Sequence, residues 1–198
     1  MCLSLYFRYL KYSSLNEVAE HIKEVVRDYI YVLIGEGEYL ETLKTKTKKL
    51  GVENRVIFLG KKTHKELFKY YVIGDVFLQP SIGHEAFGIT VIEAMASGLP
   101  VVGSISGGIK ELVKEGINGY LFNPYRENFW EELCKKIELS YKKKEFLGSN
   151  ARKFVEENYS WENCAKKLLL VIERSLYEKS SNVCGPLSSY SSYKRSSC

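Results

Sequence analysis

The sequence lacks the features that mark membrane-spanning, disulfide-rich and zinc-binding proteins. No apolar run approaches the ~18 residues that a membrane-spanning helix needs, and the opening residues, MCLSLYFRYLKY, lack the long apolar core of a signal peptide. The five cysteines are odd in number and none has CxxC spacing, which disfavours a disulfide framework and a zinc site. We expect a cytoplasmic chain without a bound metal, and a peripheral association with a membrane stays open.

The sequence also has little excess of charge of either sign. The net charge is +5 at pH 7, and the lysines are scattered along helical stretches without a long basic block. Nucleic acid is therefore not an expected partner, whereas a small phosphate-bearing ligand remains compatible. A chain of 198 residues, 45% of them hydrophobic, is long enough for one globular core.

Short apolar runs alternate with helical patterns along the chain. We expect strands at residues 3–7, 29–35, 55–60, 75–80, 100–104 and 119–124. We expect helices at residues 17–27, 39–50, 64–71, 88–97 and 107–116, and two or three more through about residue 177. Strands alternating with helices predict a parallel sheet covered on both faces, which is a doubly wound, Rossmann-like α/β domain.

The domain organisation follows from composition. Residues 1–177 carry the apolar patterns and are expected to form one domain. Residues 178–198, rich in serine from Ser181 onwards, offer little to bury and are expected to be disordered.

Three loops follow the carboxyl ends of expected strands, where ligands bind in such sheets. They are residues 35–37, 81–88 and 104–108. The first contains Gly35 and Gly37, but Leu40 stands where a dinucleotide-binding fingerprint has its third glycine. That departure argues against a nicotinamide cofactor. The pair Gly107-Gly108 in the third loop is compatible with a ligand-binding loop or with a simple tight turn.

The second loop leads into the stretch GHEAFGITVIEAMASGLP, residues 83–100. Its helix is apolar nearly all round, which predicts burial on most sides, yet Glu93 stands within it. A buried carboxylate without a partner costs several kcal/mol, as an order of magnitude. Glu93 therefore needs a hydrogen-bond donor, which is either an internal partner or a ligand.

The start of this helix has the properties of an anion site. Its first N–H groups have no intrahelical acceptor, and with the helix dipole they favour phosphate. Gly88 permits close approach of a ligand, and Glu85 and Glu93, as acceptors, suit hydroxyls. An anion site between two hydroxyl acceptors fits a nucleotide-sugar. The alternatives are an ordinary loop carboxylate at Glu85 and a solvent-facing histidine at His84; His21 and His64 show no partner in the pattern.

These residues resemble a known family. The segment EAFGITVIE, residues 85–93, resembles the E-x7-E motif of retaining glycosyltransferases of family 4, which have the GT-B fold. The resemblance extends over about residues 29–177, through YVLIGEGEYLETLKTKTKKLGVENRVIFLG, DVFLQP and the stretch that follows it to GYLFNP, and YSWENCAKKLLLVIERSLY. It implies one GT-B half, the C-terminal donor-binding domain with its extra C-terminal helices.

The resemblance implies a transfer of a hexose from a nucleotide-sugar, such as a UDP- or GDP-sugar, with retention of configuration and without a cofactor or metal. Glu93 would accept from ribose hydroxyls, and Glu85, the candidate catalytic residue, from hydroxyls of the donor sugar. Backbone amides of Phe87, Gly88 and Ile89 would hold the diphosphate. The base of the nucleotide would lie against the loop near Leu59–Lys61, and further donor contacts are implied for Arg8, Gly35 and Gly37.

Three departures from the family pattern affect this hypothesis. Ala86 replaces a glycine of the motif. Arg8 aligns with a family arginine, but Phe7 replaces the glycine before it, and Ser13 and Ser14 stand where the family has a lysine, with Lys11 out of register. The N-terminal acceptor domain of the family is absent from this sequence.

Two functions remain after this comparison. The chain is the donor-binding half of an enzyme, which reaches its carbohydrate or lipid-linked acceptor through a missing N-terminal domain or a separate subunit. Alternatively, it is a non-catalytic nucleotide-sugar-binding module or an inactive fragment. A purely structural α/β domain would leave Glu93 unexplained.

Overall fold

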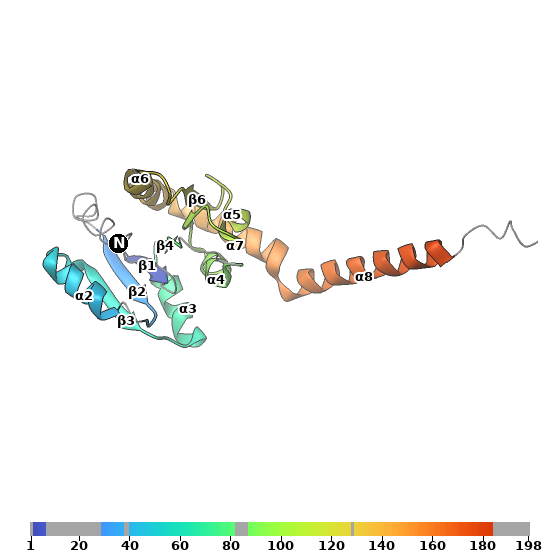
Figure 1. The fold of residues 1–198 in the computed structure, drawn as a ribbon, viewed down its shortest axis with the longest axis horizontal. Coiled ribbons are helices and arrows are strands. Elements are labelled where there is room, and N and C mark those ends of the chain that lie inside the picture. The colour runs from blue at the N-terminus through green and yellow to red at the C-terminus, as the bar shows by residue number, and fades with distance from the viewer. Residues whose placement is uncertain (1, 7–28, 38–39, 82–86, 128, 184–198) are drawn as a thin grey trace, which may run out of the picture. The chain divides into compact units, whose positions relative to one another are not determined.

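Six parallel strands form one sheet in the order β3-β2-β1-β4-β5-β6 (Figure 1). This computed structural model describes residues 2–6, 29–37, 40–81, 87–127 and 129–183. The strands are β1 (Cys2–Tyr6), β2 (Ile30–Ile34), β3 (Val56–Gly60), β4 (Val76–Gln79), β5 (Val101–Ser104) and β6 (Gly119–Phe122). The predicted doubly wound parallel sheet is confirmed.

Helices occupy most of the connections between strands and the chain after β6. They are α2 (Leu40–Lys49), the 3-10 turn η1 (Glu53–Arg55), α3 (His64–Ile73), α4 (Ile89–Ala96), α5 (Ile109–Leu112), α6 (Phe129–Lys142), α7 (Lys144–Tyr159) and α8 (Trp161–Val183). The helix predicted at residues 17–27 lies outside the described residues. None of the helices that the structure describes is long and apolar enough to cross a membrane.

The chain divides into two compact units, Met1–Glu157 and Asn158–Cys198. The sequence predicted a boundary after residue 177, and this position lies inside α8. The first part of the serine-rich segment is therefore helical up to Val183. The remainder of the predicted tail, residues 184–198, lies outside the described residues.

The strand order reverses between β1 and β4. Leu5 of β1 lies opposite Leu33 of β2 on one side and opposite Leu78 of β4 on the other. Where the strand order of a parallel sheet reverses, ligands generally bind at the carboxyl ends of the strands. The second sequence-predicted loop begins there, directly after β4.

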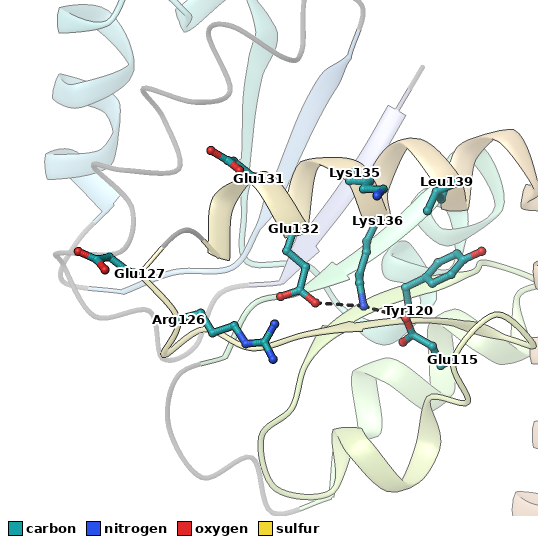
Figure 2. Close-up of a pocket in the computed structure, with 9 residues that line it drawn as sticks. All are labelled: Glu115, Tyr120, Arg126, Glu127, Glu131, Glu132, Lys135, Lys136 and Leu139. Carbon is teal, nitrogen blue, oxygen red and sulfur yellow. Dashed lines mark hydrogen bonds and ion pairs between the residues drawn. The ribbon is translucent and has the colours of Figure 1, made fainter.

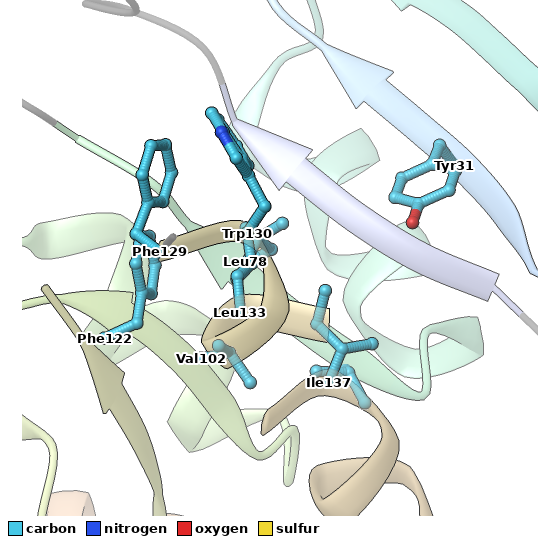
Figure 3. Close-up of a cluster of buried hydrophobic side chains, with 9 residues drawn as sticks. Tyr31, Leu78, Val102, Phe122, Phe129, Trp130, Leu133 and Ile137 are labelled. Atoms are coloured by element: carbon cyan, nitrogen blue, oxygen red, sulfur yellow. The ribbon is translucent and has the colours of Figure 1, made fainter. Parts of the chain in front are cut away.

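One face of the sheet is covered by α6. Alternate residues of β4, Val76 and Leu78, point to this face and pack with apolar side chains of α6 (Figure 3). The rings of Phe122 and Phe129 stack in this cluster with centroids 6.1 Å apart. The remaining buried members of the cluster are Tyr31, Val102, Trp130, Leu133 and Ile137.

The opposite face packs against α3, α4 and α5. Phe77, between the two inward residues of β4, meets the ring of Tyr71 from α3 at a centroid distance of 5.8 Å. Gly103 of β5 makes room for Ile109 of α5, because a Cβ at Gly103 would lie 2.5 Å from the Ile109 Cγ2 atom. Burial on both faces explains why β4 and β5, whose residues are all buried, are nearly continuous apolar runs.

The outer edge of β6 is blocked by two charged side chains. The Leu121 N–H donates to the Glu115 carboxylate at 2.7 Å, and the Leu121 carbonyl accepts from the Lys136 ammonium. Lys136 and Glu115 also form an ion pair at 2.7 Å. These bonds occupy backbone groups that would otherwise be open to pairing with another strand.

The packing of α7 depends on a glycine. A Cβ at Gly148 would lie 2.1 Å from the carbonyl oxygen of Gly98, in the turn that leads into β5. We predict that Gly148→Ala lowers the free energy of unfolding by about 1–3 kcal/mol, because the backbones must separate. Urea denaturation measures this loss. The exposed neighbour provides the control, since Ser149→Ala should change little; equal effects of the two substitutions would contradict the close approach.

Candidate functional site

The β4–α4 connection starts from a buried polar network. The Gln79 side-chain amide donates to the Ser81 hydroxyl at 2.9 Å, and the Ser104 hydroxyl donates to the Ser81 carbonyl at 2.5 Å. All three residues are buried. These bonds fix the start of the loop to the end of β5, because buried hydrogen bonds between satisfied partners are rigid. Sequence reasoning missed this network, whose one signal was a glutamine within an apolar strand.

The helix predicted at residues 88–97 is present as α4, which begins directly after Gly88. Gly88 is the residue before the helix and has a left-handed backbone conformation, with φ 83° and ψ 49°. The Phe87 and Ile89 side chains are exposed. The first N–H groups of a helix have no acceptor within that helix. The N–H groups at the start of α4 could therefore bind an anion. Whether they hold a diphosphate stays a prediction.

Glu93 lies one turn into α4 and differs from its prediction. Its side chain is 29% exposed, so it is not fully buried. Its Oε2 atom accepts from the Tyr71 hydroxyl at 3.2 Å, and its Oε1 atom lies 3.1 Å from Nδ1 of His64. Of the two alternatives for a donor, the internal partner is present. His64, for which the sequence pattern showed no partner, has Glu93 as its partner in the structure.

A capping box fixes the start of α3, where His64 is the first helical residue. The Thr63 hydroxyl accepts from the Glu66 N–H at 3.4 Å, and the Glu66 carboxylate accepts from the Thr63 N–H at 2.8 Å. The hydrogen bonds from Thr63 hold the pKa of the Glu66 carboxyl below its usual value. The capping box fixes the backbone of the first turn, from which the His64 side chain reaches Glu93.

The loops after β2 and β3 lie together. The Gly35 N–H donates to the Gly60 carbonyl at 3.0 Å, and Lys61 pairs with Glu36 at 2.9 Å. Both charged side chains are mostly exposed, so the ion pair contributes little to stability, about 0–1 kcal/mol. The structure thus brings the loop with Gly35 and Gly37 beside the predicted base-contacting segment 59–61.

Two predicted site residues, Arg8 and Glu85, lie outside the described residues, as does His84. The third loop makes a tight turn, with φ 47° at Gly107, before the four-residue helix α5. The part of the chain that the structure describes contains no group of three or more His, Cys, Asp or Glu side chains that could hold a metal ion.

A pocket of about 580 Å³ lies elsewhere, between β6 and α6 (Figure 2). Charges of both signs line it, and Lys136 reaches between Glu115 at 2.7 Å and Glu132 at 3.2 Å. It lies along the β6 edge, two strands away from β4 in the sheet. None of the predicted site residues lines it, so it is separate from the α4 start.

Gly88 offers a test of the conformation before α4. We predict that Gly88→Ala lowers the free energy of unfolding by about 1–2 kcal/mol, the cost of a side chain in the left-handed region. Its Cβ would also lie 3.2 Å from Leu112 Cδ1. Thermal or urea denaturation measures the loss, with Gly37→Ala as the control, because nothing lies within 4 Å of a Cβ there. An unchanged stability of the Gly88 variant would contradict the left-handed conformation.

Comparison with known proteins relates this chain to glycosyltransferases. Residues 6–154 match the family described as Glycosyl transferases group 1. An uncharacterized glycosyltransferase of Methanocaldococcus jannaschii is 36% identical over 140 residues, which are 71% of this chain and 36% of that protein. The matched part of the chain therefore covers little more than a third of this curated relative.

Solved glycosyltransferases share the fold. The glycosyltransferase of Rickettsia africae superposes with a TM-score of 0.75 at 22% identity, over 88% of this chain and 48% of that one. Anabaena HepE in complex with UDP-glucose superposes with a TM-score of 0.66 at 25% identity, over 91% of this chain and 48% of that one. The fold is that of one Rossmann-like half of these GT-B proteins.

Proposed function

Because the chain belongs to the family of glycosyl transferases group 1, we propose that it is the donor-binding half of a retaining, family 4 hexosyltransferase. The observation that supports this proposal is the position of the α4 start, which lies beside the point where the strand order reverses. The Glu93 carboxylate lies one turn further into the same helix. This arrangement offers amides for an anion and an acceptor for hydroxyls within a single helix.

In the proposed complex the diphosphate lies at the amides of Phe87, Gly88 and Ile89. Glu93 accepts from ribose hydroxyls, and the base lies against residues 59–61, which adjoin the Gly35 loop. HepE was solved with UDP-glucose, which supports a UDP-sugar as the first donor to test. Arg8 and Glu85 are proposed, from the sequence alone, to contact the diphosphate and the donor sugar.

In this proposal the protein promotes the reaction mainly by positioning the donor and stabilising charge. Backbone amides and the helix start stabilise charge that develops on the leaving diphosphate, and the protein holds the donor in a reactive orientation. The leaving phosphate itself takes the acceptor's proton. A carbohydrate or lipid-linked acceptor would be held by another domain or a separate polypeptide, since the chain spans 48% of the HepE structure. The cytoplasm is the proposed location, with peripheral contact to a membrane where the acceptor is a lipid.

The competing function is a nucleotide-sugar-binding module without transferase activity. The observation that favours it is the pair Ser13 and Ser14 at positions where the resemblance predicts a lysine. Loss of one charge-assisted contact to a diphosphate would weaken donor binding or charge stabilisation by about 1.5–3 kcal/mol.

Donor binding is tested with a panel of UDP, GDP, ADP and their common sugar conjugates. We predict that one nucleotide series raises the melting temperature, since ligand at 100 times its Kd stabilises a protein by about 2.7 kcal/mol. We expect Glu93→Ala to weaken that binding about tenfold or more, because a hydroxyl would lose a charged acceptor. The exposed Glu53 supplies the matched control, Glu53→Ala. Failure of every nucleotide to shift the wild-type chain would overturn the proposal.

Transfer by the isolated chain is a separate test. We predict very slow transfer from the bound nucleotide-sugar to simple sugar acceptors, because the acceptor is held by a part that this chain does not supply. Chromatography of the products with a radiolabelled donor measures the rate. Rapid transfer by the 198-residue chain alone would contradict the proposed division of labour.

A further inference from the structure

Two side chains of α3 hold the Glu93 carboxylate, one at each oxygen. The Tyr71 hydroxyl donates to Oε2 at 3.2 Å, and Nδ1 of His64 lies 3.1 Å from Oε1. The helices α3 and α4 pack side by side, so both contacts cross one helix interface. Each carboxylate oxygen can accept two hydrogen bonds, which leaves acceptor capacity at each oxygen after both contacts are made.

The two supports differ in stiffness. Tyr71 is 4% exposed, and its ring meets Phe77 edge to face at an interplanar angle of 65°. Its hydroxyl is therefore held in place by the core. The His64 side chain is 87% exposed, but the capping box around Thr63 and Glu66 fixes its backbone. One support is fixed by packing, and the other is adjustable at the surface.

We propose that Tyr71 and His64 are positioning residues that orient Glu93 to accept from two adjacent hydroxyls of a nucleoside. This inference rests on the proposed function. A carboxylate that is already oriented loses little conformational freedom when the ligand binds. Its two oxygens then match the spacing of a vicinal diol, and the chain should bind ribonucleotides more tightly than 2′-deoxyribonucleotides.

Tyr71→Phe tests the buried support, because it removes the hydroxyl and keeps the ring on Phe77. We expect it to weaken binding of the preferred ribonucleoside diphosphate about three- to tenfold. The affinity ratio between UDP and 2′-deoxy-UDP, or GDP and 2′-deoxy-GDP, should fall toward that of Glu93→Ala. Titration calorimetry measures both affinities. Tyr70→Phe removes the hydroxyl of the adjacent tyrosine and should leave the ratio unchanged.

His64 tests the exposed support without a risk to folding. His64→Ala should lower the same affinity ratio, whereas His64→Asn should restore much of it, since the Asn side-chain nitrogen lies near the position of Nδ1. Lys65→Ala, at the next exposed position of the same helical turn, is the matched control. If Tyr71→Phe fails to fold, these histidine variants decide the outcome.

The outcomes separate the two proposals. If the wild-type chain binds none of the nucleotides, the proposed function is overturned, and the inference falls with it. If it binds them but the Tyr71 and His64 variants behave like their controls, the inference is wrong and the proposed function stands. A loss that is equal for ribo- and deoxyribonucleotides also overturns the inference. In the Glu93→Ala background, Tyr71→Phe should have no further effect on binding.

Discussion

The pairing of β1 with both β2 and β4 determines where every loop of the candidate site can lie. Tyr6 lies opposite Ile34, and Leu5 lies opposite Leu78, so the three strands end together at one edge of the sheet. In parallel sheets, the carboxyl ends of the strands beside such a reversal of strand order are the usual place for a ligand. This register explains why the start of α4 and the segment 59–61 lie at the same end of the sheet, where the strands have their carboxyl ends.

The interface between α3 and α4 serves the fold and the site through the same contacts. Tyr71 packs its ring on Phe77 in the core and directs its hydroxyl to Glu93. Val91, Ala94 and Met95 of the same helix are fully buried and hold it against the sheet. Glu93 thus sits in a rigid frame without the full cost of burying a charge, because it stays partly exposed and hydrogen-bonded.

The sequence predicted the strands well because each strand has a recognisable local pattern, which is clearest in β4 and β5, where every residue is buried. Each is a short apolar run bounded by a glycine, proline or polar residue, and six such runs correspond to the observed strands. The partners of Glu93 leave no such mark. Contact of His64 and Tyr71 with Glu93 depends on how α3 is rotated against α4, and periodicity within either helix does not encode that rotation. Full burial of Glu93 was predicted from apolar neighbours in sequence, yet Ile89, in the same helix, is 62% exposed.

The spacing along α4 constrains which ligands the site accepts. The helix start attracts an anion, whereas the Glu93 carboxylate, about one turn or ~5 Å further along the axis, repels one. Inorganic phosphate near the amides would be attracted by the helix start and repelled by the Glu93 carboxylate. A ligand that places an anionic group at the amides and hydroxyls at Glu93 turns the second effect into a hydrogen bond. The proposed site would therefore favour a phosphorylated molecule with adjacent hydroxyls over phosphate alone.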